Sequence, residues 1–128
     1  MRTITIGEII TDLDKTIPLS WQESYDNAGL LCGNKEEKCT GIYVCFDISE
    51  SVVEKAIANN CNLIVSHHPL VFRAMKRFTS KDNVTTTLLK AITNNIALYS
   101  SHTNLDASNP GVNTILANKL GIRNIRPL

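Results

Sequence analysis

Residues 41–66 alternate between two apolar runs and one amphipathic segment, and this alternation constrains the fold more than any other feature of the sequence. Residues 41–46 and residues 61–66 each have the length and apolar character of a buried strand. Between them, Ser49 is a plausible N-cap for a helix over about residues 50–59. A strand, a helix and a strand of this length favour parallel pairing with a right-handed crossover, which predicts an α/β fold.

A second unit of the same kind follows along the chain. The apolar spacing predicts a helix over about residues 84–93 and a strand over residues 96–101, which would extend the parallel sheet. The irregular residues 70–84 before this helix could be a lid over a site or a surface loop tethered by Phe72 and Phe78. The tethered surface loop is the simpler interpretation.

Two more helices are predicted at the ends of the chain. Apolar residues at helical spacing predict a helix over about residues 6–16, and Thr5 with Glu8 has the form of a capping box at its start. The final helix is expected over about residues 112–119, and Gly121 fits the position just after its C-terminus. Both helices are expected to pack by an apolar face.

Residues 30–33 form a short apolar run that predicts one further strand. This strand could pair with residues 41–46 as a hairpin, although the polar connection is longer than a tight two-residue turn. The whole chain is therefore expected to be an α/β domain built from successive βαβ units.

Length and charge exclude several classes of protein. At 128 residues the chain is expected to form a single domain over residues 1–128, and a net charge of +1 gives no electrostatic case for nucleic acid or an anionic membrane. No apolar run is long enough to span a bilayer, and the N-terminus lacks the apolar region of a signal peptide, so a cytoplasmic location is expected. None of the four cysteines forms a Cys-x-x-Cys pair, which favours reduced structural thiols.

Histidine and aspartate gather where the predicted strands end. His67 and His68 follow one strand directly, and His102 to Asp106 follow the next, so that these two segments contain all three histidines of the chain. Asp47 follows a third strand, although a turn or capping role before the helix is the preferred interpretation for it. Ligands of open α/β sheets collect beyond the carboxyl ends of the strands, and nitrogen and oxygen donors suit Zn, Mn, Fe or Co. The alternative is that the histidines are satisfied by hydrogen bonds alone.

Adjacent residues of an extended chain point to opposite sides, so His67 and His68 could not both reach one ion without a kink. They could more easily serve two neighbouring ions, with Asp106 as the bridging carboxylate. Pro69 favours an extended conformation at His68, which supports this divergent arrangement. Two ions about 3.5–4 Å apart would activate a bridging water molecule, which is the chemistry of many hydrolases.

Three segments together resemble a known family. Residues 24–33 (SYDNAGLLCG) resemble its Trp-Asp-Asn-x-Gly-Leu-x-x-Gly segment, and residues 62–70 (NLIVSHHPL) resemble its double-histidine motif. Residues 99–106 (YSSHTNLD) and 111–113 (GVN) resemble its third motif. In this order, over nearly the whole chain, they resemble the Nif-three-like family, which is also described as GTP cyclohydrolase I type 2 homologues. Tyr25 stands where the family usually has Trp, and it is expected to be tolerated as packing.

The resemblance implies a three-layer α/β/α fold with a mixed, largely parallel sheet, two similar halves and a toroidal hexamer. It also implies a dinuclear centre of divalent metal ions, with His67, His68 and Asp106 at ligand positions and His102 lining the site. Family members supply a further His and Glu from a second half, whereas no His, Asp or Glu follows Asp106 here. The chain is therefore expected to correspond to the N-terminal half of the family fold, with the C-terminal half absent.

The resemblance thus implies the metal-binding half of a metal-dependent hydrolase that acts on a small substrate, which could be nucleotide-like. No catalytic group is assignable beyond a metal-bound water molecule, and this chain alone is expected to be incomplete for catalysis. The competing function is a non-catalytic metal-binding or assembly protein of the same family. A homo-oligomer is expected in either case.

Overall fold

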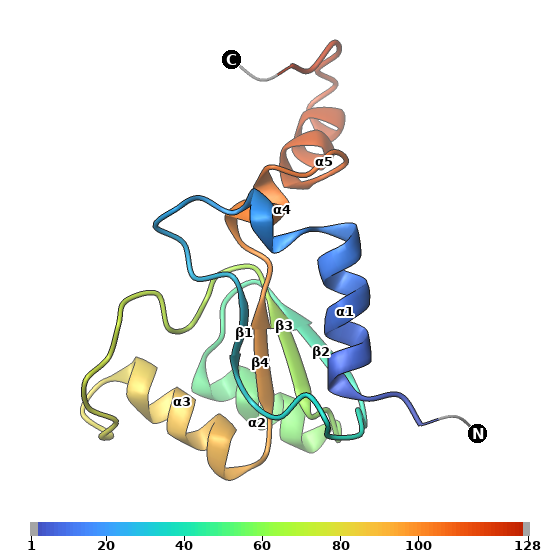
Figure 1. Ribbon diagram of the computed structural model, residues 1–128. Coiled ribbons are helices and arrows are strands. Elements are labelled where there is room, and N and C mark those ends of the chain that lie inside the picture. The colour runs from blue at the N-terminus through green and yellow to red at the C-terminus, as the bar shows by residue number, and fades with distance from the viewer. Residues whose placement is uncertain (1–2, 127–128) are drawn as a thin grey trace.

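A four-stranded mixed sheet forms the centre of the protein, which we describe from a computed structural model over residues 3–126 (Figure 1). The strand order is β1-β4-β3-β2. Strands β2 (Ile42–Cys45), β3 (Leu63–Ser66) and β4 (Ala97–Ser100) are parallel, whereas β1 (Gly29–Cys32) pairs with β4 in the antiparallel direction. The predicted α/β fold with a mixed, largely parallel sheet is confirmed.

Both predicted strand–helix–strand units are present. Helix α2 (Glu50–Ala58) connects β2 to β3, and its first turn is capped by the Ser49 side chain, which accepts a hydrogen bond from the Val52 amide. Helix α3 (Asn83–Thr93) precedes β4, and the side chain of Asp82 caps it in the same way through the Thr85 amide. These crossovers place β2, β3 and β4 side by side with their carboxyl ends at one edge.

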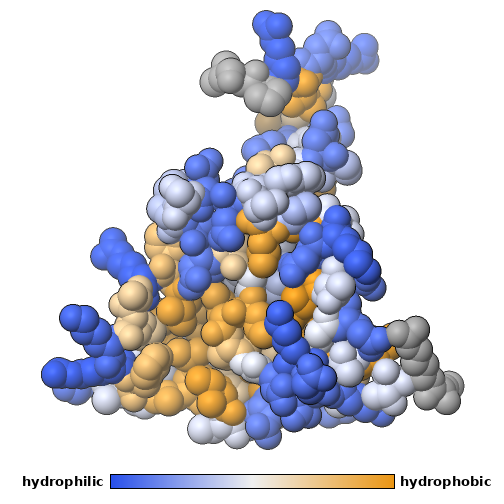
Figure 2. All heavy atoms as spheres, in the orientation of Figure 1, coloured by the Kyte–Doolittle hydropathy of each residue, from blue (hydrophilic) through white to orange (hydrophobic). Residues whose placement is uncertain are grey.

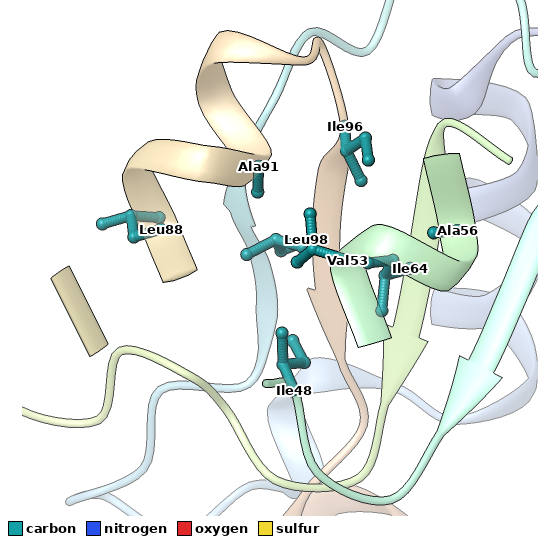
Figure 3. Close-up of a cluster of buried hydrophobic side chains, with 8 residues drawn as sticks. All are labelled: Ile48, Val53, Ala56, Ile64, Leu88, Ala91, Ile96 and Leu98. Carbon is teal, nitrogen blue, oxygen red and sulfur yellow. The ribbon is translucent and has the colours of Figure 1, made fainter. Parts of the chain in front are cut away.

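Helices cover both faces of the sheet, so the three-layer arrangement is confirmed (Figure 1). Helix α1 (Ile6–Thr16) begins with the predicted capping box, and it packs on one face through Ile6 and Ile10. Helices α2 and α3 pack on the other face, where a cluster of buried side chains fills the space between them and the sheet (Figure 3). That cluster consists of Ile48, Val53, Ala56, Ile64, Leu88, Ala91, Ile96 and Leu98.

The predicted hairpin between β1 and β2 is wrong, because β1 pairs with β4 at the opposite edge of the sheet. Gly33 ends β1 with a φ of +114°, and a Cβ atom there would lie 2.5 Å from the Cβ atom of Ala97. A glycine is therefore needed where the chain leaves β1 and passes close to β4. Beyond this turn the chain crosses to the far edge and forms β2 there.

Two short helices were absent from the sequence prediction, namely the 3₁₀ turn η1 (Leu19–Trp21) and α4 (Thr103–Asp106). The final helix α5 (Val112–Lys119) is present as predicted, and Gly121 follows it with a φ of +70°. Helix α5 stands away from the sheet beyond α4 (Figure 1). All four cysteines are free thiols, as predicted.

Apolar surface is distributed unevenly over the molecule. In the view of Figure 2, apolar side chains gather over the region where β1 and α3 lie, and polar side chains surround them. Helix α5 and the segment after it also expose apolar side chains, which are Ile115, Leu116, Leu120, Ile122 and Ile125. Within residues 3–126, no helix is long and apolar enough to cross a membrane.

Candidate metal centre

The three histidines lie together at the carboxyl edge of the parallel strands. His67 and His68 follow β3, and His102 follows β4. One ring nitrogen from each histidine lies within 4.8 Å of those of the other two. The ring centroids are separated by 4.9 Å between His67 and His68, and by 5.4 and 5.5 Å from these to His102. Parallel pairing of β3 with β4 brings these segments together although they are far apart in the sequence.

The chain bends at His67 and His68, so the divergence expected of an extended chain is wrong here. The hydroxyl of Ser66 donates to the carbonyl oxygen of His68 at 2.9 Å, which folds the chain back over two residues. The His68 amide in turn donates to the carbonyl oxygen of Phe46 at 3.0 Å. These contacts turn both imidazole rings toward the same region, at an interplanar angle of 44°.

Each of the three imidazole rings is held by its Nδ1 atom. The partner of Nδ1 is the carbonyl oxygen of Ser101 for His67, at 2.9 Å, and a carboxylate oxygen at 2.7 Å for both His68 and His102. All three partners are acceptors, so a neutral ring carries its hydrogen on Nδ1 and keeps a lone pair on Nε2. Metal-binding histidines in proteins are oriented by hydrogen bonds of this kind.

Asp47 is the carboxylate that holds His68. Of the expected turn or capping role for Asp47, the capping part is wrong, since Ser49 caps helix α2, whereas Asp47 does lie in a bend after β2 and its Oδ1 accepts from His68 Nδ1. The side chain of Asp47 is 70% exposed, and water can therefore compete for this hydrogen bond. Its position directly after a strand was the signal that could have identified this role.

Asp26 is the carboxylate that holds His102, and no pattern in the sequence predicted it as a site residue. Its Oδ1 accepts from His102 Nδ1, and its Oδ2 accepts from the amide and the hydroxyl of Thr103. Burial alone would raise the pKa of Asp26, but the hydrogen bonds from Thr103, His102 and Asn27 outweigh it and hold that pKa below its usual value. Asp26 therefore remains an anion beside His102 at neutral pH.

Asp106 lies at the end of α4, on the side of His67. Its Oδ1 atom is 3.6 Å from His67 Nε2, and its side chain is 40% exposed. Two groups that bind the same ion lie at about this separation, because each is roughly 2.0–2.2 Å from the metal. Asp106 thus lies next to His67, outside the group of three histidine nitrogens that lie within 4.8 Å of one another.

Two phenyl rings border the histidines. Phe46 stacks on His67 with centroids 5.1 Å apart and meets His68 edge-on at 4.6 Å, whereas Phe72 meets His102 edge-on at 6.0 Å. Phe72 therefore ties the start of the irregular 70–84 segment to the site, where the side chain of Asn27 also donates to the carbonyl oxygen of Val71. Phe46 and Phe72 both keep exposed surface that could contact a bound molecule.

The donor set fits a divalent metal ion. Three neutral imidazoles with a position left open for water form a known catalytic zinc arrangement, and imidazole with carboxylate also suits Mn, Fe and Co. The three nitrogens lie within 4.8 Å of one another, whereas two nitrogens bound to one ion at roughly 2.0–2.1 Å lie no more than about 4.2 Å apart, so the rings would move closer together on binding. The alternative of histidines satisfied by hydrogen bonds alone accounts for Nδ1 of each ring but not for the convergence of all three.

Comparisons with known proteins identify relatives of this chain. Residues 4–128 match the family described as Duf34/NIF3 (NGG1p interacting factor 3). A protein of Staphylococcus epidermidis named GTP cyclohydrolase 1 type 2 homolog is 42% identical over 120 residues, which cover 94% of this chain and 32% of the relative. The chain thus spans about a third of the length of this curated relative.

Solved structures show the same fold. The crystal structure of a hypothetical protein of Staphylococcus aureus superposes with a TM-score of 0.91 at 37% identity, covering 97% of this chain and 35% of that protein. A Bacillus cereus protein described as related to NIF3 gives a TM-score of 0.92 at 32% identity, and the match covers 97% of this chain and 34% of the Bacillus cereus protein. The similarity in each case covers nearly all of the present chain.

Proposed function

The chain belongs to the Duf34/NIF3 family, and from that membership we propose that it supplies the metal-binding part of a metal-dependent hydrolase acting on a small molecule. The proposed ligands are His67, His68 and Asp106, with His102 as an additional donor. The observation that supports this most directly is the convergence of three imidazole nitrogens within 4.8 Å of one another.

A divalent ion held there would lower the pKa of a water molecule toward neutrality and polarise the bond to be hydrolysed. In this proposal the residues of the chain bind the ion and contact the substrate. Each histidine would bind the ion through Nε2 while Nδ1 stays hydrogen-bonded, and the half-exposed Asp106 carboxylate, whose Oδ1 atom lies 3.6 Å from His67 Nε2, would bind the ion beside His67. Phe46 and Phe72 offer apolar contacts for the organic part of the substrate, of which a nucleotide is one candidate.

The number of ions is also part of the proposal. The four donors of this chain suffice for one ion with open positions. A two-ion centre requires more ligands, such as the further His and Glu that the family resemblance implies. We therefore propose one ion for this chain alone and two for a protein that contains those additional residues.

Metal content provides the direct test. The purified chain, loaded with Zn or Mn and freed of excess ion, should retain metal, and His67→Ala and Asp106→Asn should lower the retained amount. Asp12→Asn is a matched control, because Asp12 is an exposed carboxylate of α1 that pairs with Lys15. Equal metal content in the wild type and in a His67→Ala, His68→Ala double variant would contradict the proposal.

The hydrolase part of the proposal is tested separately from metal binding. The metal-loaded chain and a full-length relative are compared in a screen of phosphate ester, nucleotide and cyclic amide hydrolysis, each with a metal-free control. Metal-dependent turnover that is lost in His67→Ala supports the hydrolase. Metal binding by both proteins without turnover by either would favour the second candidate, a non-catalytic metal-binding or assembly protein.

The exposed apolar side chains of α5 favour an assembly role alongside either function. Leu116 and Leu120 each keep more than half of their surface accessible, which is costly for a helix that remains alone in water. We propose that the chain forms a homo-oligomer, for which the toroidal hexamer of the family is the candidate. Light scattering at increasing concentration tests this, and a strictly monomeric species at high concentration would contradict it.

A further inference from the structure

Asp26 is a buried carboxylate to which the proposed function assigns no role. We propose that Asp26 is a positioning residue that fixes the ring of His102 so that its Nε2 atom becomes a metal ligand. This inference rests on the proposed metal site and adds to it a residue outside the set of metal ligands.

The contacts of Asp26 leave its carboxylate little freedom. Oδ1 accepts from His102 Nδ1 and from the Asn27 amide, both at 2.7 Å, and Oδ2 accepts from the Thr103 amide at 3.0 Å and from the Thr103 hydroxyl. The Thr103 hydroxyl also accepts from the amide of Glu23 at 2.9 Å. These bonds join the segment before β1 to the segment after β4, and the Asp26 side chain has no exposed surface between them.

The bond from His102 to Asp26 decides which nitrogen of His102 is available. A carboxylate is only an acceptor, so the hydrogen of a neutral His102 ring must lie on Nδ1, and the lone pair then lies on Nε2. The main chain of His102 is held independently, because its amide donates to Asn104 Oδ1 at 2.9 Å. Without Asp26, the main chain would keep its place while the ring could exchange its tautomer and rotate.

The pair formed by Asp47 and His68 provides an internal comparison. The two hydrogen bonds have the same length of 2.7 Å, but the Asp47 side chain is largely exposed whereas the Asp26 side chain is buried. Water can take the place of an exposed carboxylate beside His68, but it has no ready access to the position of Asp26. Loss of Asp26 should therefore reduce metal affinity more than loss of Asp47.

The experiment measures Zn affinity by competition with a chelator for the wild type, Asp26→Asn and Asp47→Asn. Asp26→Asn should weaken binding by about 10- to 100-fold, and Asp47→Asn by less. The Co-substituted Asp26→Asn protein should also change its visible absorption spectrum, which reports the geometry of the ligands. Asp14→Asn, which removes the carboxylate partner of Tyr99, should leave the spectrum unchanged because it alters only the hydrogen bond between α1 and β4.

A double-variant cycle separates positioning from a general structural effect. If Asp26 acts through His102, then Asp26→Asn should cost no further affinity in a His102→Ala background. An equal loss of affinity in both backgrounds would overturn the inference, as would an Asp26→Asn protein with wild-type affinity and spectrum. If Asp26→Asn does not fold, Thr103→Val removes one donor to the same carboxylate, and it should weaken Zn binding several-fold. Failure of the wild type to bind Zn would instead refute the proposed function itself.

Discussion

The two faces of the sheet are covered to different extents. One face lies under both α2 and α3, and the side chains between them are buried (Figure 3). The other face lies under α1 alone, which packs on Leu63, Ala97 and Tyr99 of the two central strands. The edge strand β2 places the side chains of Ile42 and Val44 on this second face, beside Leu63 and Val65. Ile42 and Val44 remain exposed there.

This difference separates the part of the sheet that stabilises the fold from the part that borders the site. His67 follows β3 directly, and it contacts Phe46, which follows the exposed edge strand. The open part of the α1 face therefore leads directly to the proposed metal ligands. Substitutions on the filled face should act on stability, whereas those near the open edge should act on binding.

Truncation of a central side chain on the filled face should have the largest effect. Leu98 is fully buried between β4 and the two helices, so Leu98→Ala should lower the free energy of unfolding by about 2–5 kcal/mol. Urea denaturation followed by circular dichroism measures this loss. A loss below about 1 kcal/mol would show that the two faces do not differ as described.

Addition of metal should produce the next largest effect, at the open edge. An ion that binds only the folded chain stabilises it by about 2.7 kcal/mol when the free ion exceeds its Kd by a factor of 100. The melting temperature should therefore rise on adding Zn, and chelation should reverse the rise. His67→Ala should abolish the response to Zn, whereas Leu98→Ala should lower stability but preserve the response.

Tyr99 provides a smaller test on the covered part of the α1 face. Its hydroxyl donates to Asp14 Oδ1 at 2.6 Å, so Tyr99→Phe should cost about 1 kcal/mol at neutral pH. Burial, together with the neighbouring Asp14 carboxylate, raises the pKa of Tyr99 in the folded state.

The pH dependence follows from the direction of that shift. The stability contributed by neutral Tyr99 is complete below the unfolded-state pKa of about 10 and is lost as the pH rises above it. The free energy of unfolding of the wild type should thus fall toward that of Tyr99→Phe above about pH 10, as measured by urea titrations at several pH values. A constant difference between the two proteins up to pH 11 would contradict the assigned role of Tyr99.

The smallest effect is expected on the exposed edge strand. Val44 is 74% exposed, so Val44→Thr should change the free energy of unfolding by no more than about 0.5 kcal/mol. The same urea titrations measure it in the isolated chain at low concentration. A loss similar to that of Leu98→Ala would show that the open part of the α1 face is covered in solution.

Local patterns predicted the parts of the fold that depend on neighbouring residues. Apolar spacing and capping residues such as Thr5 and Ser49 identified α1 and α2, and the strand before His67 predicted the edge on which the histidines lie. The pairing of β1 was missed because its partner β4 is distant in the sequence, and a nearby strand was the default choice. The close approach of Gly33 to Ala97, where a Cβ atom on Gly33 would lie 2.5 Å from the Ala97 Cβ atom, could not be read from the local sequence either.

The candidate site was predictable to a similar extent. His67, His68, His102 and Asp106 were identified because each lies next to a predicted strand end or within a motif of the family. Asp26 was not identified as a site residue, since nothing local indicates that its partner is His102, 76 positions later. The bend at His67 and His68 was also missed, because it depends on the hydrogen bond from Ser66 to His68 and on tertiary contacts with Phe46.

The antiparallel pairing of β1 with β4 has a consequence for synthesis on the ribosome. Asp26 and β1 leave the ribosome early, whereas their partners His102 and β4 are synthesised later. Synthesis of the 76 residues from Asp26 to His102 takes roughly 4–15 s at usual translation rates. During that interval the β2–α2–β3 unit already has its own partners within reach, whereas β1 has none. The nascent chain should therefore form the β2–α2–β3 unit before His102 becomes available to the proposed metal site.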